Sequence, residues 1–237
     1  YICGYTNARG DQCDNCGSLL DASQLENPRS KIDGSTPELR ETEHFYLDLG
    51  ALETAIVEFL KEREAYLRLN VVRQSLGQIL AKGLHGRAIT RDLDWGIPVP
   101  VEGWEGKCLY VWFEAVIGYL SAAIEWAKLE GQPHEWENWW TNPDSRAYYF
   151  IGKDNIPFHA VIWPGQLFGV GEWFGKIFNN KEGMKLMLPY DVPANEYMNM
   201  ERQKISGSRN WAVWGLDFLS RYDPDPLRYY LTVNMPE

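Results

Sequence analysis

Two short apolar runs, each followed by a helical pattern, constrain the fold of this chain more than any other feature. The runs are residues 109–112 and residues 147–152, and the second ends in glycine. Helical spacing of apolar residues follows at 115–124 and again at 158–162. Strand-like runs that alternate with helices indicate a parallel sheet with crossover helices. We therefore predict an α/β fold.

The ends of these two runs are candidate ligand contacts, because ligands bind at the carboxyl ends of parallel strands. This places Trp112 and residues 152–154 at a candidate site. Helical periodicity also extends over residues 46–83, with Gly83 and Gly86 ending it. A polar loop is predicted over residues 203–210, and a helix from there to the end.

The composition is that of a globular protein. The 237 residues are 45% apolar and 24% charged, enough for one large domain or two small ones. Eleven Trp and thirteen Tyr residues suit a large core or an aromatic-lined pocket. A net charge of −10 excludes a small basic module that binds nucleic acid by charge alone, although a large enzyme can still present a local basic strip.

Three of the four cysteines lie close to the start of the chain. Cys3 is followed by the C-x-x-C pair Cys13 and Cys16. A structural zinc site needs four ligands, usually as two such pairs, so we expect a fourth cysteine immediately before Tyr1, completing C-x-x-C with Cys3. The alternative is three free thiols in a loop. Cys108 lies in an apolar run and is predicted to be a core residue.

Cysteines that bind a metal ion and do not form disulfides indicate a reducing compartment. We therefore expect a cytoplasmic location. No apolar run approaches the roughly 20 residues that a bilayer-spanning helix needs. We therefore expect no membrane association.

Several blocks of the sequence resemble those of one enzyme family. In order they are residues 5–17 (YTNARGDQCDNCG), 40–45 (RETEHF), 91–100 (RDLDWGIPVP), 110–119 (YVWFEAVIGY), 150–159 (FIGKDNIPFH) and 204–208 (KISGS). Together these blocks resemble the methionyl-tRNA synthetases, which are class I aminoacyl-tRNA synthetases. Several blocks in the right order are far more specific than one short motif.

The resemblance implies an internal fragment with four parts. Residues 1–45 would be the zinc-knuckle part of the connective insertion, and residues 46–106 its helical remainder and the return to the core. Residues 107–180 would be the second half of the Rossmann-like catalytic domain, and residues 181–237 the signature-loop region. A fragment that lacks the first catalytic half is expected to be inactive alone.

Three departures from the family pattern are present. The His-Ile-Gly-His motif is absent, and we expect it upstream of the first residue. Gly207 stands where the signature loop has its second lysine, and we hypothesise that Lys204 or Arg209 compensates. Ser30 and Asp33 lie where some relatives have a second cysteine pair, so we expect no second zinc ion.

The resemblance implies methionine–tRNA ligase activity in protein synthesis. The substrates would be methionine, ATP with Mg²⁺, and tRNA(Met), and a structural Zn²⁺ would be bound by Cys3, Cys13 and Cys16. Aromatic rings suit a thioether, because sulfur–aromatic contacts contribute about 0.3–1.5 kcal/mol. The implied methionine pocket comprises Trp112, Ala115, Tyr119, His159 and Trp163. For these aromatic residues, ordinary core packing is the alternative.

Further roles implied by the resemblance concern the charged end of the substrate and the nucleotide. Arg91 would pair with the substrate carboxylate, since a guanidinium fork fits that group. Its alternative is an ion pair with Asp92 or Asp94. The ATP-binding residues would be Gly152, Asp154, Lys204, Ser206 and Ser208, with Lys204 and Arg91 assisting catalysis. Helix N-capping is the alternative for Asp154 and for Asn155.

Two other functions remain open at this level. One is a class I synthetase for leucine, isoleucine or valine, on the same sheet. The aromatic pocket residues favour a flexible sulfur-containing side chain over a branched one. The second is a non-catalytic zinc-ribbon paralogue that binds tRNA, which the missing lysine of the signature loop allows.

Overall fold

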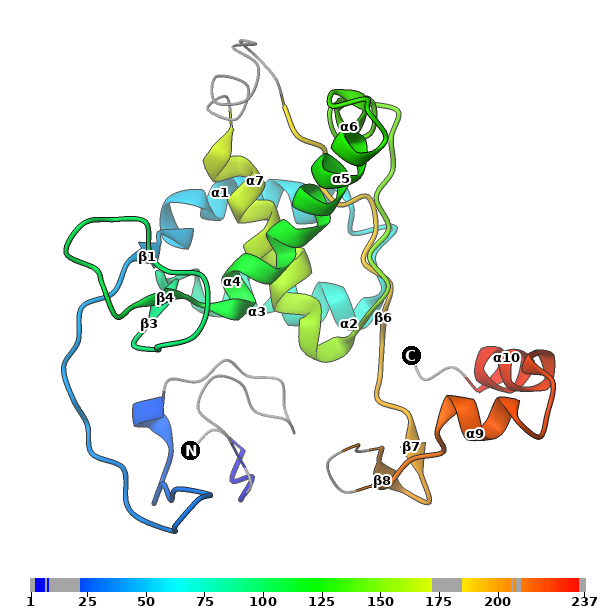
Figure 1. Cartoon of the computed structure of the whole chain (residues 1–237), viewed down its shortest axis with the longest axis horizontal. Coiled ribbons are helices and arrows are strands. Elements are labelled where there is room, and N and C mark those ends of the chain that lie inside the picture. Colours follow the sequence, from blue (N-terminus) through cyan, green and yellow to red (C-terminus); the bar gives the residue numbers. More distant parts are fainter. Residues whose placement is uncertain are drawn as a thin grey trace.

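The computed structural model describes residues 3–6, 8, 22–171, 185–205, 207 and 210–234. The helices are η1 (Ala22–Gln24), α1 (Leu49–Glu62), α2 (Leu69–Val72), the π-helix η2 (Arg73–Gly77), α3 (Gln78–Lys82), α4 (Val111–Glu114), η3 (Ala115–Ile117), α5 (Gly118–Leu129), α6 (Glu135–Trp140), η4 (Lys153–Asn155), the π-helix η5 (Phe158–Ile162), α7 (Trp163–Val170), α9 (Gly215–Leu219) and α10 (Pro224–Val233). Helices α1 to α7 gather into one core, whereas α9 and α10 lie apart from it (Figure 1).

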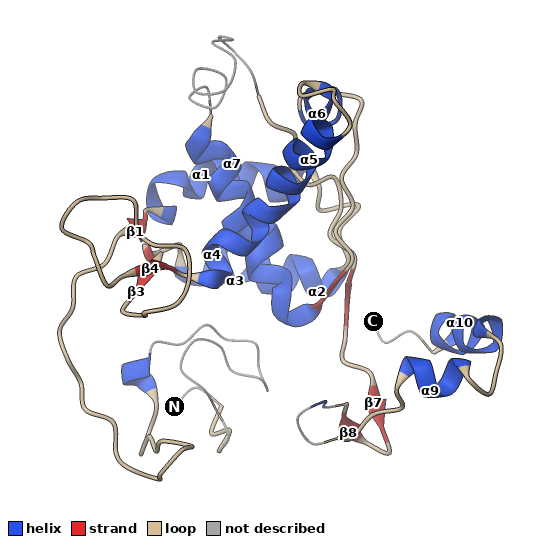
Figure 2. Cartoon of the chain, viewed as in Figure 1, coloured by secondary structure: helices blue, strands red, loops and turns tan. Residues whose placement is uncertain are grey.

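The strands are short and occur in four pairs within the described residues (Figure 2). The antiparallel pairs are β1 (Tyr46–Leu47) with β2 (Arg87–Ala88), β3 (Thr90–Arg91) with β4 (Cys108–Leu109), and β7 (Asn199–Met200) with β8 (Gln203–Lys204). The parallel pair is β5 (Ile151–Gly152) with β6 (Ala194–Asn195). Parallel pairing after an intervening helical stretch was predicted, but the partner of β5 is β6 and not the run at residues 109–112.

Helix α1 contributes buried residues to the core, and the local sequence explains where it begins. The Asp48 carboxylate accepts a hydrogen bond from the backbone N–H of Ala51 at 3.1 Å, which caps the helix start. Leu49, Ile56 and Leu60 recur on one face and are buried. The predicted helix over 46–83 is thereby confirmed in outline, with a break between α1 and α2.

Helix α7 packs closely on α1, and Gly165 makes this approach possible. A Cβ atom at Gly165 would lie 3.0 Å from Cδ2 of Leu49 and 3.4 Å from Cδ1 of Ile56. A larger residue would push the two helices apart. This packing fixes the position of α7 and of η5, which runs directly into it.

The predicted strand over residues 109–112 is wrong beyond Leu109. Strand β4 ends at Leu109, where it pairs antiparallel with Thr90 rather than joining the parallel pair. The carbonyl of Tyr110 then accepts hydrogen bonds from the N–H groups of Phe113 and Glu114, which starts α4. A short apolar run does not distinguish a strand from a buried helix start by periodicity alone.

Other predictions for single elements have mixed outcomes. Gly83 ends α3 with φ at +70°, as its place in the sequence predicted. Cys108 is buried, which confirms it as a core residue. The predicted C-terminal helix is two helices, α9 and α10, with a break before Pro224. No helix in the described part of the chain combines the length and the apolar character needed to cross a bilayer.

Candidate active site

Four aromatic side chains from separate elements form a connected cluster beside β5. Tyr119 comes from α5, Tyr149 from the segment before β5, His159 from η5 and Trp163 from α7. The Tyr119 and Tyr149 ring centroids are 4.9 Å apart, and each ring lies 5.6 Å from the imidazole of His159. Three of the five predicted pocket residues therefore lie together.

Hydrogen bonds define the state of His159, which is 5% exposed. Its Nδ1 lies 3.0 Å from the carbonyl oxygen of Asn155, which can only accept, so Nδ1 carries the proton. Its Nε2 lies 2.8 Å from the Tyr119 hydroxyl. Burial favours the neutral imidazole, and in that form Nε2 accepts a hydrogen bond from the Tyr119 hydroxyl.

A pH dependence follows from His159. Burial lowers the pKa of its imidazole below the usual 6.5. As the pH falls below 6.5, the unfolded chain binds a proton that the folded protein still excludes, so the free energy of unfolding decreases. This contribution to the free energy of unfolding is fully present above pH 6.5. It is lost as the pH falls from 6.5 to the lowered pKa of His159 in the folded protein.

We expect the free energy of unfolding, measured with urea, to change less between pH 7.5 and pH 5.5 in His159→Gln than in the wild-type protein. Burial also lowers the pKa of His44, which contributes with the same sign in both proteins. An identical pH slope in the two proteins would contradict this assignment.

Tyr149 is a member of the cluster that the sequence did not single out. Its hydroxyl accepts a hydrogen bond from Nε1 of Trp163 at 3.0 Å, and burial raises its pKa to about 12. It therefore stays protonated and links Trp163 to the two other rings. The available signal was a hydroxyl-bearing ring three residues before the glycine that ends the apolar run.

Trp112 and Ala115 lie in α4 and η3, the short helices that lead into α5 and Tyr119. The indole of Trp112 stacks on Phe158, with centroids 5.0 Å apart and planes at 22°. It is 45% exposed, and Ala115 is exposed as well. Phe158 is the residue before His159 on η5, so Trp112 packs on the segment that carries His159. Trp163 itself is 2% exposed and also lines a separate apolar cavity of about 300 Å³.

Arg91 lies at the end of β3 and its guanidinium is held in a fixed orientation. Its Cζ is 3.8 Å from the centroid of the Tyr110 ring. Its Nη1 donates to the backbone carbonyls of Ala88 at 3.1 Å and Thr90 at 2.8 Å. Arg91 and Tyr110 both line an open cavity of about 940 Å³.

The surroundings of Arg91 are organised by a second set of contacts. Asp92, the predicted alternative partner of Arg91, forms an ion pair with Nζ of Lys107 at 2.6 Å. The same ammonium donates to Thr42 at 2.7 Å, and Nδ1 of His44 lies 3.0 Å from the Thr90 hydroxyl. These bonds tie the 40–45 block to the floor of the cavity.

Gly152 and Asp154 form a tight turn at the carboxyl end of β5. A Cβ atom at Gly152 would lie 2.8 Å from Oδ1 of Asp154, so the carboxylate occupies the space that glycine leaves. The capping alternative for Asp154 is wrong, because it lies within η4, whose N-cap is Gly152 and has no side-chain cap. The carboxylate instead accepts from Nδ2 of Asn155 at 3.3 Å.

The remaining predicted residues are only partly described. Cys3 is exposed, while Cys13, Cys16, Ser206, Ser208 and Arg209 lie outside the described residues. Lys204 lies in β8. Among residues that the structure describes, no group of three or more His, Cys, Asp or Glu side chains could hold a metal ion. The predicted zinc site and signature loop therefore stay predictions.

Comparison with known proteins identifies the family. The family model for tRNA synthetases class I (M) matches residues 1–237. The chain belongs to this family. A Methionine–tRNA ligase of Thermomicrobium roseum is 55% identical over 235 residues, covering 99% of this chain and 38% of the relative. One of Dehalococcoides mccartyi is 56% identical, covering 99% of this chain and 40% of the relative.

Solved structures of class I (M) synthetases have the same fold. Mycobacterium tuberculosis methionyl-tRNA synthetase bound by methionyl-adenylate superimposes with a TM-score of 0.64 at 20% identity. The match covers 91% of this chain and 39% of that chain. The mixed α/β content is thus that of a class I synthetase fold. The chain spans about 38–40% of the length of the curated relatives quoted above.

Proposed function

We propose that this class I (M) synthetase chain is part of a methionine–tRNA ligase. The enzyme would activate methionine with ATP to methionyl-adenylate and transfer the methionyl group to tRNA(Met). The cluster of Tyr119, His159 and Trp163 beside the glycine-ended strand β5 carries this proposal. Relatives that are 55% and 56% identical over 99% of the chain are named for this activity.

The methionine side chain would lie against the aromatic cluster. The proposed pocket residues are Trp112, Ala115, Tyr119, His159 and Trp163. Three features support this assignment: rings that suit a thioether, a neutral imidazole without a buried charge, and exposed faces on Trp112 and Ala115. An unbranched substrate side chain can extend between such rings. A branched one would contact the rings at its branch point, nearer to the backbone of the amino acid.

Arg91 would bind the substrate carboxylate. Its guanidinium is held by two backbone carbonyls and by the Tyr110 ring, and it lines an open cavity. Activation is an in-line attack of that carboxylate on the α-phosphate of ATP. The protein then needs to position two anions and to stabilise charge on the phosphate oxygens.

The nucleotide would bind at the carboxyl end of β5. Gly152 would let it approach the backbone, and Asp154 would accept hydrogen bonds from its ribose hydroxyls or from the substrate ammonium. Lys204, Ser206 and Ser208 would form the signature loop over the phosphates, with Lys204 supplying positive charge. A Mg²⁺ ion bound with ATP would neutralise part of the phosphate charge.

The first part of the chain would hold a structural zinc ion through Cys3, Cys13 and Cys16. Thiolates in this spacing support that assignment. We also propose the four parts predicted from the sequence: the zinc knuckle at 1–45, the rest of the insertion at 46–106, half of the Rossmann-like domain at 107–180 and the signature-loop region at 181–237.

The test is ATP–pyrophosphate exchange by the full-length protein with methionine, leucine, isoleucine and valine. We expect kcat/KM for methionine to exceed that for each other amino acid by at least about 100-fold, since aliphatic misfits cost roughly 10–200-fold each. A preference for a branched amino acid would establish a sister synthetase. Binding of tRNA without exchange on any amino acid would establish a non-catalytic paralogue.

A further inference from the structure

A second cavity lies on the other side of η5 from the aromatic cluster. It measures about 350 Å³, within the roughly 300–1,000 Å³ range of small-molecule sites. Its walls come from η2, α3, the start of α1 and η5. Pro157, Val161 and Ile79 contribute to an aliphatic floor. His159 and Trp163, which face the aromatic cluster, do not line it, so the cavity is separate from the proposed methionine pocket.

Three cationic or basic side chains lie at the edge of this cavity. Lys82 ends α3, His85 lies in the turn that follows, and Arg87 begins β2. Within the described residues, none of the three forms an ion pair or a side-chain hydrogen bond, and no carboxylate lines the cavity. Such an unpaired positive group is unusual in a chain of net charge −10 and favours an anionic ligand.

One acidic side chain, Glu53, lies next to this edge of the cavity. The carboxylate of Glu53 accepts a hydrogen bond from the Leu84 backbone N–H at 2.6 Å and is not a lining residue. It holds the turn that carries His85. Among the residues that the structure describes, no carboxylate lines the cavity itself.

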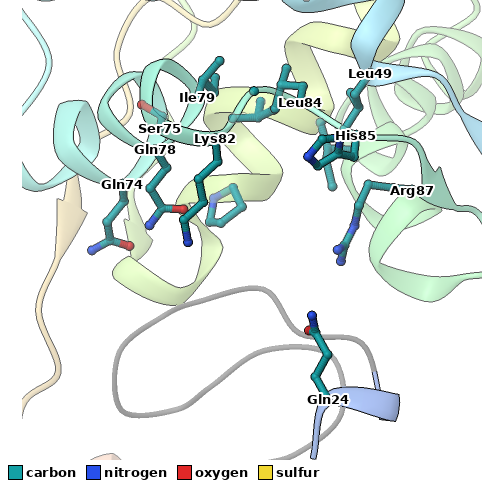
Figure 3. A pocket seen from close by; sticks show the side chains of 14 residues that line it. Gln24, Leu49, Gln74, Ser75, Gln78, Ile79, Lys82, Leu84, His85 and Arg87 are labelled. Atoms are coloured by element: carbon teal, nitrogen blue, oxygen red, sulfur yellow. The ribbon is translucent and has the colours of Figure 1, made fainter. Parts of the chain in front are cut away.

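Side-chain amides add hydrogen-bonding groups to the same opening. Gln74 and Gln78 extend from η2 and α3, and Gln24 approaches from the opposite side (Figure 3). Lys82 and Arg87 extend toward the space between them (Figure 3). Glutamine amides can pair with the edge of a purine base, and Lys and Arg bind phosphate. Cations, amides and an aliphatic floor together match one ligand class.

We propose that this cavity is a second nucleotide site. Lys82, His85 and Arg87 bind the phosphate, the aliphatic floor contacts the base or ribose, and Gln74 and Gln78 bind the base edge. The ligand is either a free nucleotide or a single unpaired nucleotide of an RNA chain. Both ligands present the same phosphate and base. An RNA chain also has further backbone that leaves the cavity, and a free nucleotide does not.

The test measures binding to the full-length protein with its adenylate site filled by a non-hydrolysable methionyl-adenylate analogue. The probes are inorganic phosphate, adenosine monophosphate and a fluorescein-labelled single-stranded RNA octamer. We expect adenosine monophosphate or the RNA to bind more tightly than phosphate. Lys82→Ala/Arg87→Ala should weaken that binding roughly 100-fold, because two charge-assisted contacts are lost.

The matched control is Lys61→Ala/Lys128→Ala, which removes the same charge from exposed helical positions outside the cavity. We expect it to change binding by less than about twofold. Gln78→Glu is a second variant that keeps both cations and adds a carboxylate at the exposed opening, and it should also weaken binding.

The outcomes are distinct. Binding of adenosine monophosphate identifies a free nucleotide as the source, and binding of the RNA alone identifies an unpaired nucleotide in a chain. Equal weakening in both double variants, tightest binding by phosphate, or no binding of any probe would overturn the proposal. Binding of the adenylate analogue is recorded separately, so a failure of the proposed ligase function is recognised independently.

Discussion

Replacement of Trp163 by alanine is expected to lower the free energy of unfolding by about 3–5 kcal/mol. Trp163 is 2% exposed and contacts rings on two sides, with Trp140 at a centroid distance of 6.0 Å. Its removal would leave a large cavity and an unsatisfied Tyr149 hydroxyl. The measurement is urea unfolding of the full-length protein and its variant.

Two further variants separate packing from hydrogen bonding at this position. Trp163→Phe keeps a ring but loses the Nε1 hydrogen bond to Tyr149, with an expected cost of about 1–2 kcal/mol. Trp95→Ala removes the same indole from a position that is 89% exposed and should cost less than about 0.5 kcal/mol. A loss below 1 kcal/mol in Trp163→Ala would show that the ring is not a core residue.

Replacement of Arg91 by alanine is expected to lower kcat/KM for methionine in pyrophosphate exchange by roughly 10²–10³-fold, because the partner of a substrate carboxylate is removed. Arg91→Lys should recover only part of this loss, since an ammonium lacks the guanidinium fork. This expectation rests on the proposed function. The stacked Tyr110 ring and two carbonyls hold the guanidinium in place before substrate binds.

A matched arginine provides the control. The guanidinium of Arg146 stacks on Tyr190 at 4.7 Å, outside the predicted site, and Arg146→Ala should change kcat/KM by less than about twofold. Methioninol, which lacks the carboxylate, should bind Arg91→Ala and wild-type protein equally. Equal weakening of methionine and methioninol by Arg91→Ala would assign Arg91 a structural role instead.

Local sequence determined the features that depend on neighbouring residues. Helical spacing located the stretch that contains α1, and Gly83 ended α3 at a positive φ. The order of the sequence blocks between residues 5 and 208 indicated the family, which the family model confirmed. Each feature depends on side-chain period, cap chemistry or backbone freedom within a few residues, which a single sequence displays directly.

Tertiary structure alone decided which groups meet. Tyr149 joins Trp163 to the Tyr119–His159 pair across three separate elements, and Tyr110 supports Arg91 from the start of α4. The tautomer of His159 depends on a carbonyl four residues back and on a hydroxyl forty residues away. Such contacts arise from the packing of distant segments, which local spacing does not encode. For the same reason Leu109 paired with Thr90 in an antiparallel ladder rather than in the predicted parallel sheet.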